Sequence, residues 1–213
     1  MVHHLLMQSK MKNIPKKTTI IIGEGPTEFF YFNSLKDDYK GLASTISPAC
    51  PKHTSIPELK KKIEESINRG YEKIYCVIDM DNKHDVKSKT EYEKLKNAYN
   101  NKVKKNRYTN TKSEIRFFET ERCTELFFYF YFKYTTMKFH NYEQVSQKLN
   151  SVCFYEKKIE FFRKHPLHPY FKQNGGSLNA AINNAIKSIG DRKTDDKDYT
   201  YSELGEMFKE LGI

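Results

Sequence analysis

Two hydrophobic runs in this chain each end abruptly in acidic residues, and this repetition constrains the fold more than any other feature. Residues 18–23 read TTIIIG and lead into EGP at 24–26, whereas residues 73–78 read KIYCVI and lead into DMD at 79–81. Continuous apolar runs of this kind are typical of strands that are buried on both faces, as in parallel sheets. The carboxyl ends of such strands meet at one edge, so we expect the acidic residues to lie near each other.

Segments with helical periodicity separate the predicted strands. Pro26 suits the first turn of a helix, and phenylalanines follow it on one face. Ser55 with Glu58, and Ser88 with Glu91, have the spacing of capping boxes. We therefore predict helices from Pro26 to about Tyr39, from Ser55 to Gly70, and from Ser88 to a basic end at Lys102–Arg107, with further strands at Leu42–Ser47 and Glu114–Phe118.

The pattern after Thr120 is helical only. The predicted helices cover Glu121–Thr135, Tyr142–Leu149, Tyr155–Lys164, Ser177–Ile189 and Tyr201–Leu211. Alternating strands and helices followed by helices alone predict the α/β class, with a mostly parallel sheet flanked by helices and a C-terminal helical extension. We expect an N-terminal arm at residues 1–17, an α/β core at 18–135, and a helical extension at 136–213 that packs on the core.

Four carboxylates fall at the predicted sheet edge. Asp79 and Asp81 are two residues apart and point the same way in extended backbone, and Glu24 and Glu28 are one helical turn apart. At about 4 Å and an effective dielectric constant of about 20, each like-charged pair costs on the order of 4 kcal/mol. A divalent cation relieves this repulsion, and oxygen ligands favour Mg²⁺ or Mn²⁺. Taken alone, the DMD segment is equally an ordinary turn sequence.

We assign roles within this set as hypotheses. Asp79 and Asp81 hold the principal metal ion, while Glu24 either joins them or acts as general base or acid, so these three form the predicted catalytic set. Glu125 lies inside the apolar run CTELFFYFYF, where an unpaired carboxylate is costly. It is a candidate further metal ligand, or else a buried cap or an ion pair with Arg122 or Arg116. In HPLHP, residues 165–169, the two prolines predict a rigid turn.

The charge balance favours polyanionic partners. Lys and Arg outnumber Asp and Glu by 37 to 27, which gives a formal net charge of +10. The densest basic stretch contains Lys102, Lys104, Lys105 and Arg107, which we predict to bind nucleic acid; a solvated helix end is the alternative. A lysine-rich, AT-biased genome would also produce such a composition.

The remaining features point to a cytoplasmic protein. The four cysteines show no CxxC spacing, and no secretory leader is recognisable. The longest apolar stretch, Leu126–Phe132, is broken by Lys133 and is far shorter than the roughly 18 residues that a membrane span needs. We expect no membrane association.

The order of these segments resembles known families. IIIGEGPTEFFYF at 20–32 and IYCVIDMD at 74–81 resemble the TOPRIM signature, in which a Glu and a DxD at two strand ends act on nucleic-acid phosphodiesters. ETERCTELFFYFYF at 119–132 resembles the Asn-Pro-Cys-x-Glu-Leu-Trp block of the RloB-like family, with Cys123, Glu125 and Leu126 matching. AAINNAIKSI and DYTYSELGEMFKEL, near the C-terminus, resemble its closing helices.

The resemblance implies a TOPRIM-like fold and a Mg²⁺- or Mn²⁺-dependent nuclease that acts on RNA, such as tRNA, or on DNA. Related OLD-type nucleases use both Glu of an EGxTE segment for metal binding, which implies the same for Glu28. RloB-like proteins are associated with phage defence and abortive infection, and a partner ATPase or other defence protein is a candidate partner. Two alternatives are a nucleotidyl-transfer enzyme and a non-catalytic nucleic-acid-binding or sensor subunit.

Overall fold

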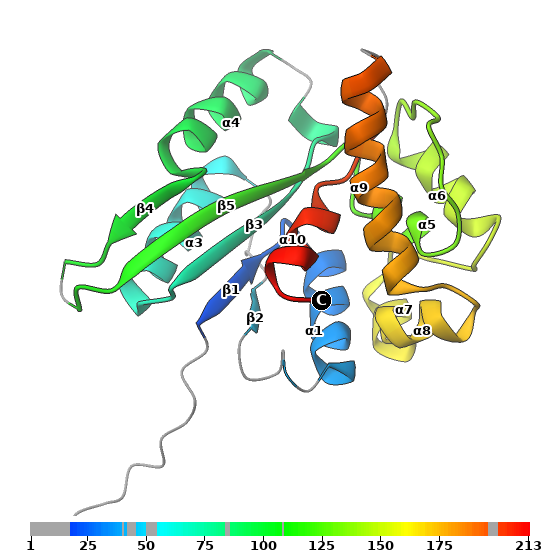
Figure 1. The fold of residues 1–213 in the computed structure, drawn as a ribbon, viewed down its shortest axis with the longest axis horizontal. Coiled ribbons are helices and arrows are strands. Elements are labelled where there is room, and N and C mark those ends of the chain that lie inside the picture. The colour runs from blue at the N-terminus through cyan, green and yellow to red at the C-terminus, as the bar shows by residue number, and fades with distance from the viewer. Residues whose placement is uncertain are drawn as a thin grey trace, which may run out of the picture.

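A five-stranded sheet forms the centre of the protein (Figure 1). The computed structural model describes residues 18–39, 41, 46–49, 55–83, 86–107, 109–195 and 200–213. The sheet has the order β2-β1-β3-β5-β4, from strands β1 (Thr19–Ile22), β2 (Ile46–Ala49), β3 (Lys73–Asp79), β4 (Lys102–Lys105) and β5 (Lys112–Thr120). All neighbours pair in parallel except β4, which is antiparallel to β5. The predicted α/β class with a mostly parallel sheet is confirmed.

Helices cover both faces of the sheet. Alternate residues of a strand point to opposite faces, so the continuous apolar runs of β1 and β3 supply two separate cores. On one face, Ile20 and Ile22 pack with residues of α3 (Ile56–Arg69) and α4 (Val86–Tyr99). On the other face, Ile21 joins a larger core that contains residues of α1 (Pro26–Asp38) and of the C-terminal helices.

The second core is rich in aromatic rings and continues from the sheet into the C-terminal helices. These helices are α5 (Glu125–Phe130), α6 (Tyr142–Asn150), α7 (Ile159–Lys164), α8 (Leu167–Gln173), α9 (Leu178–Asp195) and α10 (Leu204–Glu210). Phe127 of α5 stacks on Phe208 of α10 at a ring-centroid distance of 5.4 Å, and Phe128 contacts Phe171 of α8 at 5.0 Å. One continuous cluster thus includes residues from both sides of the predicted boundary at residue 135. That division stays a prediction.

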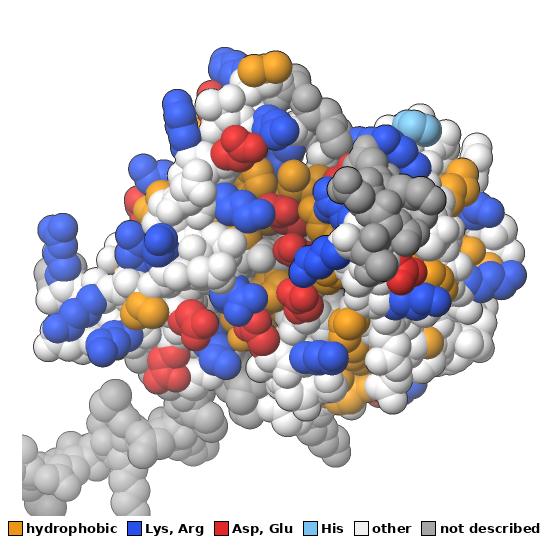
Figure 2. All heavy atoms as spheres, turned by 45° about the horizontal axis from the view of Figure 1, so that its top comes forward, with side chains coloured by type: hydrophobic (Ala, Val, Ile, Leu, Met, Phe, Trp, Pro, Cys, Tyr) orange, Lys and Arg blue, Asp and Glu red, His pale blue; other side chains and the backbone are white. Residues whose placement is uncertain are grey.

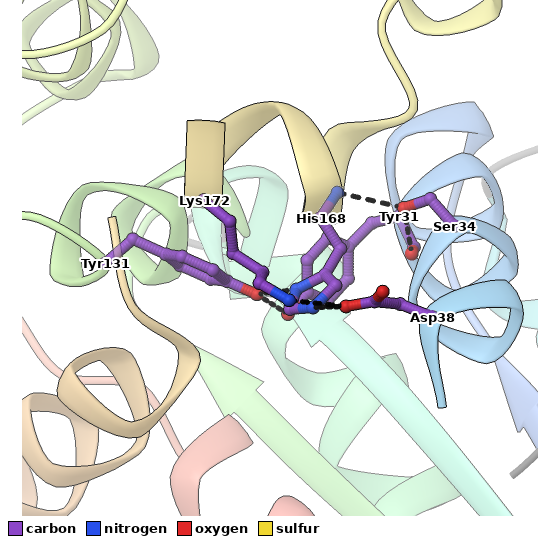
Figure 3. A network of polar contacts seen from close by, with 6 residues as sticks. All are labelled: Tyr31, Ser34, Asp38, Tyr131, His168 and Lys172. Atoms are coloured by element: carbon purple, nitrogen blue, oxygen red, sulfur yellow. Dashed lines mark hydrogen bonds and ion pairs between the residues drawn. The ribbon is translucent and has the colours of Figure 1, made fainter. Parts of the chain in front are cut away.

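A buried polar network ties α1 to α5 and α8 inside this core (Figure 3). The Tyr131 hydroxyl lies 2.6 Å from that of Tyr31 and 2.8 Å from Nδ1 of His168, which is fully buried. Nε2 of His168 lies 3.1 Å from Asp38, whose carboxylate also accepts a hydrogen bond from Lys172 at 2.7 Å. Burial lowers the pKa of His168, against the opposing effect of Asp38.

The structure corrects the prediction for the basic stretch. The helix that we expected to continue into Lys102–Arg107 ends at Tyr99, and Asn101, with a left-handed φ of 56°, turns the chain into β4. Asn tolerates this conformation better than most residues. Val103, within the stretch that we expected to be helical, is 62% exposed. The helix also begins at Val86, so Ser88 lies inside it and is not its N-cap.

Of the six helices that the structure describes after Thr120, five were predicted with shifted boundaries and one, α8, was missed. The helix expected at Glu121–Thr135 is limited to α5, because residues 121–124 form a loop at the end of β5. The predicted rigid turn at 165–169 instead starts α8, with Pro166 at the N-cap. Proline is tolerated there because the first turn of a helix lacks internal N–H partners. The helix expected from Tyr155 begins only at Ile159.

Several predictions concern residues that lie partly or wholly outside the described ranges. These are the arm at 1–17, Cys50, and positions 42–45 of the second strand, which is described as Ile46–Ala49. Ser55 caps α3 as predicted, accepting a hydrogen bond from the Glu58 N–H at 3.4 Å, and Gly70 ends the helix with a φ of 77°. Within the described ranges, no helix has the length and apolar character needed to cross a membrane.

The network in Figure 3 predicts an asymmetric effect of two substitutions. Tyr131→Phe leaves the Tyr31 hydroxyl and the His168 Nδ1 without this buried partner, so we expect the free energy of unfolding to fall by about 1–3 kcal/mol. Asp38→Asn should cost less, because the Asp38 side chain is 34% exposed and water replaces its contacts. Urea denaturation of both variants tests this, and equal losses would contradict it.

Candidate metal centre

The junction of β1 and α1 positions the first two carboxylates. Glu28 lies in the first turn of α1, where its Oε2 accepts a hydrogen bond from the Gly25 N–H at 2.8 Å. A Cβ at Gly23 would overlap the Cβ of Glu28, so only glycine permits this close approach. Glu24, in the turn between the two elements, accepts a hydrogen bond from Lys83 Nζ at 2.7 Å. The EGxxE spacing therefore produces one buried carboxylate and one at the rim.

Asp79 ends β3 directly beside this junction. Its Oδ1 accepts two hydrogen bonds from Thr124, from the backbone N–H and from the hydroxyl, both at 2.8 Å. The loop that carries Thr124 follows β5, which pairs with β3 up to Asp79 and Thr120. Arg122 in this loop has a φ of 38°, and its carbonyl accepts a hydrogen bond from the Asp81 N–H at 2.9 Å. The loop thus holds the DMD segment at the carboxyl edge.

Glu125, at the start of α5, is fully buried. Its Oε1 accepts hydrogen bonds from the Tyr155 hydroxyl at 2.9 Å and from Lys157, whose Nζ lies at 3.0 Å. The alternative ion pairs with Arg122 or Arg116 are not found: Arg116 binds Glu210 at 2.5 Å, and Arg122 Nε donates to the Phe139 carbonyl. Oε2 of Glu125 and Oε1 of Glu28 are buried without a hydrogen-bond partner.

The pKa shifts of Asp79, Glu28 and Glu24 indicate that these carboxylates and that of Glu125 lie near one another. Burial, followed by the charges of Glu28, Glu125 and Glu24, raises the pKa of Asp79 well above its usual value. Burial and the neighbouring Glu125 raise the pKa of Glu28 to about 7. Burial also raises the pKa of Glu24, although Lys83 opposes this. Desolvation and like charge both favour the neutral acids, so the cluster is electrostatically frustrated.

Two lysines offset this negative charge. Lys83, only 7% exposed, binds Glu24 and also donates to the Asp79 backbone carbonyl at 2.6 Å. Lys157 is 40% exposed and reaches the cluster from the segment before α7. Burial acts to lower the pKa of Lys157, but the charges of Glu125 and Asp79 outweigh it and raise the pKa overall.

The residues fit a divalent cation in their chemistry but are not arranged around one. Across the described ranges, no three His, Cys, Asp or Glu side chains have the spacing of a preformed metal site. Lys83, Lys157 and Thr124 each hold one carboxylate oxygen instead. The donors are nevertheless all hard oxygens, and two of them are buried and unpaired, which suits Mg²⁺ or Mn²⁺. A cation would replace the lysine contacts of Glu24 and Glu125.

The other predicted site residues are Asp81, at the rim of this cluster, and the basic stretch at 102–107, which lies away from it. Asp81 is partly exposed, begins a short 3₁₀ turn (Asp81–Lys83), and is not among the charges that act most strongly on Asp79. The basic residues 102–107 lie near the other edge, because Lys105 pairs with Lys112 at the start of β5. The roles predicted for all these residues stay predictions.

Comparison with known proteins places the chain in a family. The profile described as RloB-like protein matches residues 19–211. The chain belongs to the RloB-like family. A search of curated proteins gave no match, and neither did a search of solved structures. In this RloB-like protein, Cys123 and Glu125 of the family-like block lie at the acidic cluster: burial and then Glu125 and Asp79 raise the pKa of the Cys123 thiol.

Sequence reasoning missed the cations and hydrogen-bond donors of the centre. Lys83 lies four residues after Asp79 in DMDNK, so the sequence indicates that it is close to Asp79. The sequence does not indicate that Lys83 forms an ion pair with Glu24. Thr124 directly precedes Glu125 in the segment at 119–132 that resembles the RloB-like family, but nothing in the sequence marks it as a donor to Asp79. Lys157 and Tyr155 had no local signal, because the fold of α5 and the α6–α7 segment brings them to Glu125.

The raised pKa of Glu28 predicts how stability depends on pH in a metal-free solution. A folded-state pKa of about 7 against an ordinary 4.5 means that Glu28 contributes stability below pH 4.5, and that this contribution is lost as the pH rises through 7. The loss is on the order of 3 kcal/mol. With EDTA present, the free energy of unfolding measured in urea should fall between about pH 5 and 8.

Glu28→Gln should flatten this profile, since the amide stays neutral throughout. Glu93→Gln, which changes an exposed carboxylate on α4, is the matched control and should leave the profile unchanged. Parallel profiles for the wild type and Glu28→Gln would show that Glu28 is ionised in the folded protein over this range.

Proposed function

We propose that this RloB-like protein is a divalent-metal-dependent nuclease that hydrolyses nucleic-acid phosphodiesters. The observation that carries the proposal is the buried, mutually repelling carboxylate cluster at the carboxyl edge of the sheet, with unpaired oxygens on Glu28 and Glu125. In open α/β sheets this edge is where ligands bind. A cluster of this kind destabilises the folded chain unless a cation, a proton or a lysine compensates it.

We propose a role for each residue of the cluster from its contacts. Asp79, Glu28 and Glu125 would hold Mg²⁺ or Mn²⁺, with Asp81 entering from the rim, and the ion would polarise the phosphate and activate water. Glu24, whose pKa is raised, would accept or donate the proton when its contact with Lys83 opens. Lys157 is the partly exposed cation of the cluster, and it stabilises negative charge on the scissile phosphate.

The biological setting of the proposal rests on family membership. We propose a role in bacterial phage defence, including abortive infection, with RNA such as tRNA or DNA as substrate and a partner ATPase or other defence protein as regulator. The match to the RloB-like profile over residues 19–211 is what supports this setting. We propose a cytoplasmic location for the same reason.

One observation favours a second candidate function. Lys83 and Lys157 already neutralise part of the cluster, and the described side chains do not form a preformed metal site. A non-catalytic subunit that binds nucleic acid, with the carboxylates and lysines as structural ion pairs, has this same arrangement. The two functions differ in whether the protein binds metal and cleaves its ligand.

Cleavage assays test the nuclease directly. We expect purified protein to cut tRNA, single-stranded or duplex substrates with Mg²⁺ or Mn²⁺ and to lose the activity in EDTA. Asp79→Asn and Glu125→Gln should each reduce the rate at least about a hundredfold, because each removes a charge that positions the ion. Asp37→Asn, an exposed change on α1, is the control. Activity that survives chelation or Asp79→Asn would refute the mechanism.

Thermal denaturation separates the two candidate functions without a substrate. Mn²⁺ at about 100 times its Kd should stabilise the native state by about 2.7 kcal/mol, or raise Tm by roughly 5–10 °C in a chain of this size. Asp79→Asn should abolish the shift, and Asp81→Asn tests whether the rim carboxylate joins the ligand set. No shift in the wild type, together with nucleic-acid binding in EDTA, would favour the non-catalytic function.

A further inference from the structure

A basic pocket lies near the β4 edge of the sheet, separate from the acidic cluster. The ends of α3 and α4, together with β4 and the turn that follows it, line this pocket, which is open to solvent and has a volume of about 460 Å³. This volume is within the range of small-ligand sites. The lining residues are Glu64, Ile67, Asn68, Tyr99, Lys104, Lys105 and Arg107. Three cations and one carboxylate give the pocket a net positive charge.

A buried asparagine fixes the backbone next to the pocket. Asn106 is 1% exposed, and its side-chain amide donates to the carbonyls of Ile67 at 2.9 Å and Asn68 at 2.8 Å. The Gly70 N–H also donates to the Ile67 carbonyl, at 3.0 Å. The carbonyls at a helix C-terminus carry partial negative charge that would repel an anion. These hydrogen bonds occupy carbonyls of that last turn and position the adjacent cations Lys105 and Arg107.

An aromatic ring forms one wall. The Tyr99 hydroxyl donates to Glu64 at 2.9 Å, and this bond orients both side chains. Lys104 Nζ lies 5.4 Å from the centroid of the Tyr99 ring, within the range of a cation–π contact. Aromatic faces beside cations are the usual combination in sites that stack a base and bind its phosphate. Asn68 adds amide groups that can pair with a base edge.

Protection of the sheet edge accounts for only part of this arrangement. Lysines on an exposed edge strand prevent pairing with other chains, and all four residues of β4 are exposed. That explanation covers Lys102 and Lys104. It requires neither Arg107, which lies beyond the strand, nor an aromatic wall beside the cations. Figure 2 shows blue side chains gathered at the end of the molecule where Figure 1 places β4.

The pocket is too far from the acidic cluster to belong to it. Lys105 pairs with Lys112 at the start of β5, whereas Asp79 pairs with Thr120 at its end. Eight residue steps at about 3.3 Å place these two pairs roughly 26 Å apart. A mononucleotide cannot span this distance, so a ligand in the pocket is either a separate small molecule or one part of a polymer.

We propose that this pocket is a nucleotide-phosphate site. Lys104, Lys105 and Arg107 bind the phosphate, and the base lies against Tyr99 with Asn68 at its edge. The ligand is a free nucleotide or a nucleotide within a nucleic-acid strand, and both present the same chemistry to these residues. The site does not rest on the proposed nuclease, because it uses none of the acidic residues.

Binding in EDTA tests the site without a contribution from metal at the acidic cluster. The probes are ATP and a single-stranded RNA of about 12 nucleotides, within the range of lengths that single-strand-binding domains cover. Lys104→Ala/Arg107→Ala should weaken binding at least about tenfold and reduce the slope of log K against log salt by about 1.4 for the single-stranded RNA. Lys148→Ala/Lys164→Ala removes the same charge from exposed positions on α6 and α7 and should change affinity little.

These binding measurements identify the source of the phosphate, and they can also contradict the proposal. Saturable ATP binding that Lys104→Ala/Arg107→Ala abolishes supports a free nucleotide, and RNA binding without ATP binding supports a polymer. Tyr99→Leu should weaken either ligand, whereas Tyr99→Phe should keep most of the affinity because the ring remains. If neither probe binds, or if the pocket and control double variants bind alike, the proposal is wrong. Nuclease assays on the same variants report on the acidic cluster separately.

Discussion

The structure depends on a concentration of like charge that three separate segments bring to one edge of the sheet. Glu24 and Glu28 come from the junction of β1 and α1, Asp79 from the end of β3, and Glu125 from the start of α5, after β5. Hydrophobic burial of the strands drives this convergence, since their apolar residues cannot be covered without placing their ends together. Three groups offset the repulsion between these carboxylates: Lys83 binds Glu24, Lys157 binds Glu125, and the Thr124 hydroxyl binds Asp79.

The parallel sheet and the acidic edge were predictable because both follow from local patterns. An apolar run followed by a polar turn defines a strand end, and such ends lie at the same edge of a parallel sheet. The two acidic ends are close together because β1 and β3 are neighbours. The cations were not predictable, since Lys157 is 78 positions after Asp79 and only the packing of the helices relates them. Tertiary contacts of that kind leave no periodicity in the sequence.

The errors in secondary structure have a common cause. Lysine and arginine at 102–107 have good helix propensity, so the helical pattern of α4 appeared to continue. The segment instead becomes a strand because it can pair with β5, and Asn101 supplies the reversal. In the same way, Thr124 ends the loop before α5 because its hydrogen bonds go to Asp79. Long-range pairing overrides local preference in both places.

Helix α1 connects the acidic cluster at the sheet edge with the buried network around His168. Its first turn carries Glu28, and its last residue, Asp38, takes part in the network around His168. Ten residues of helix place these two groups roughly 15 Å apart on a stiff rod. The orientation of Glu28 is therefore set at both ends of the rod. Variants at Tyr131 or His168 should alter how closely Glu28 approaches Asp79, and through it the metal affinity that we propose for the cluster, even where the chain still folds.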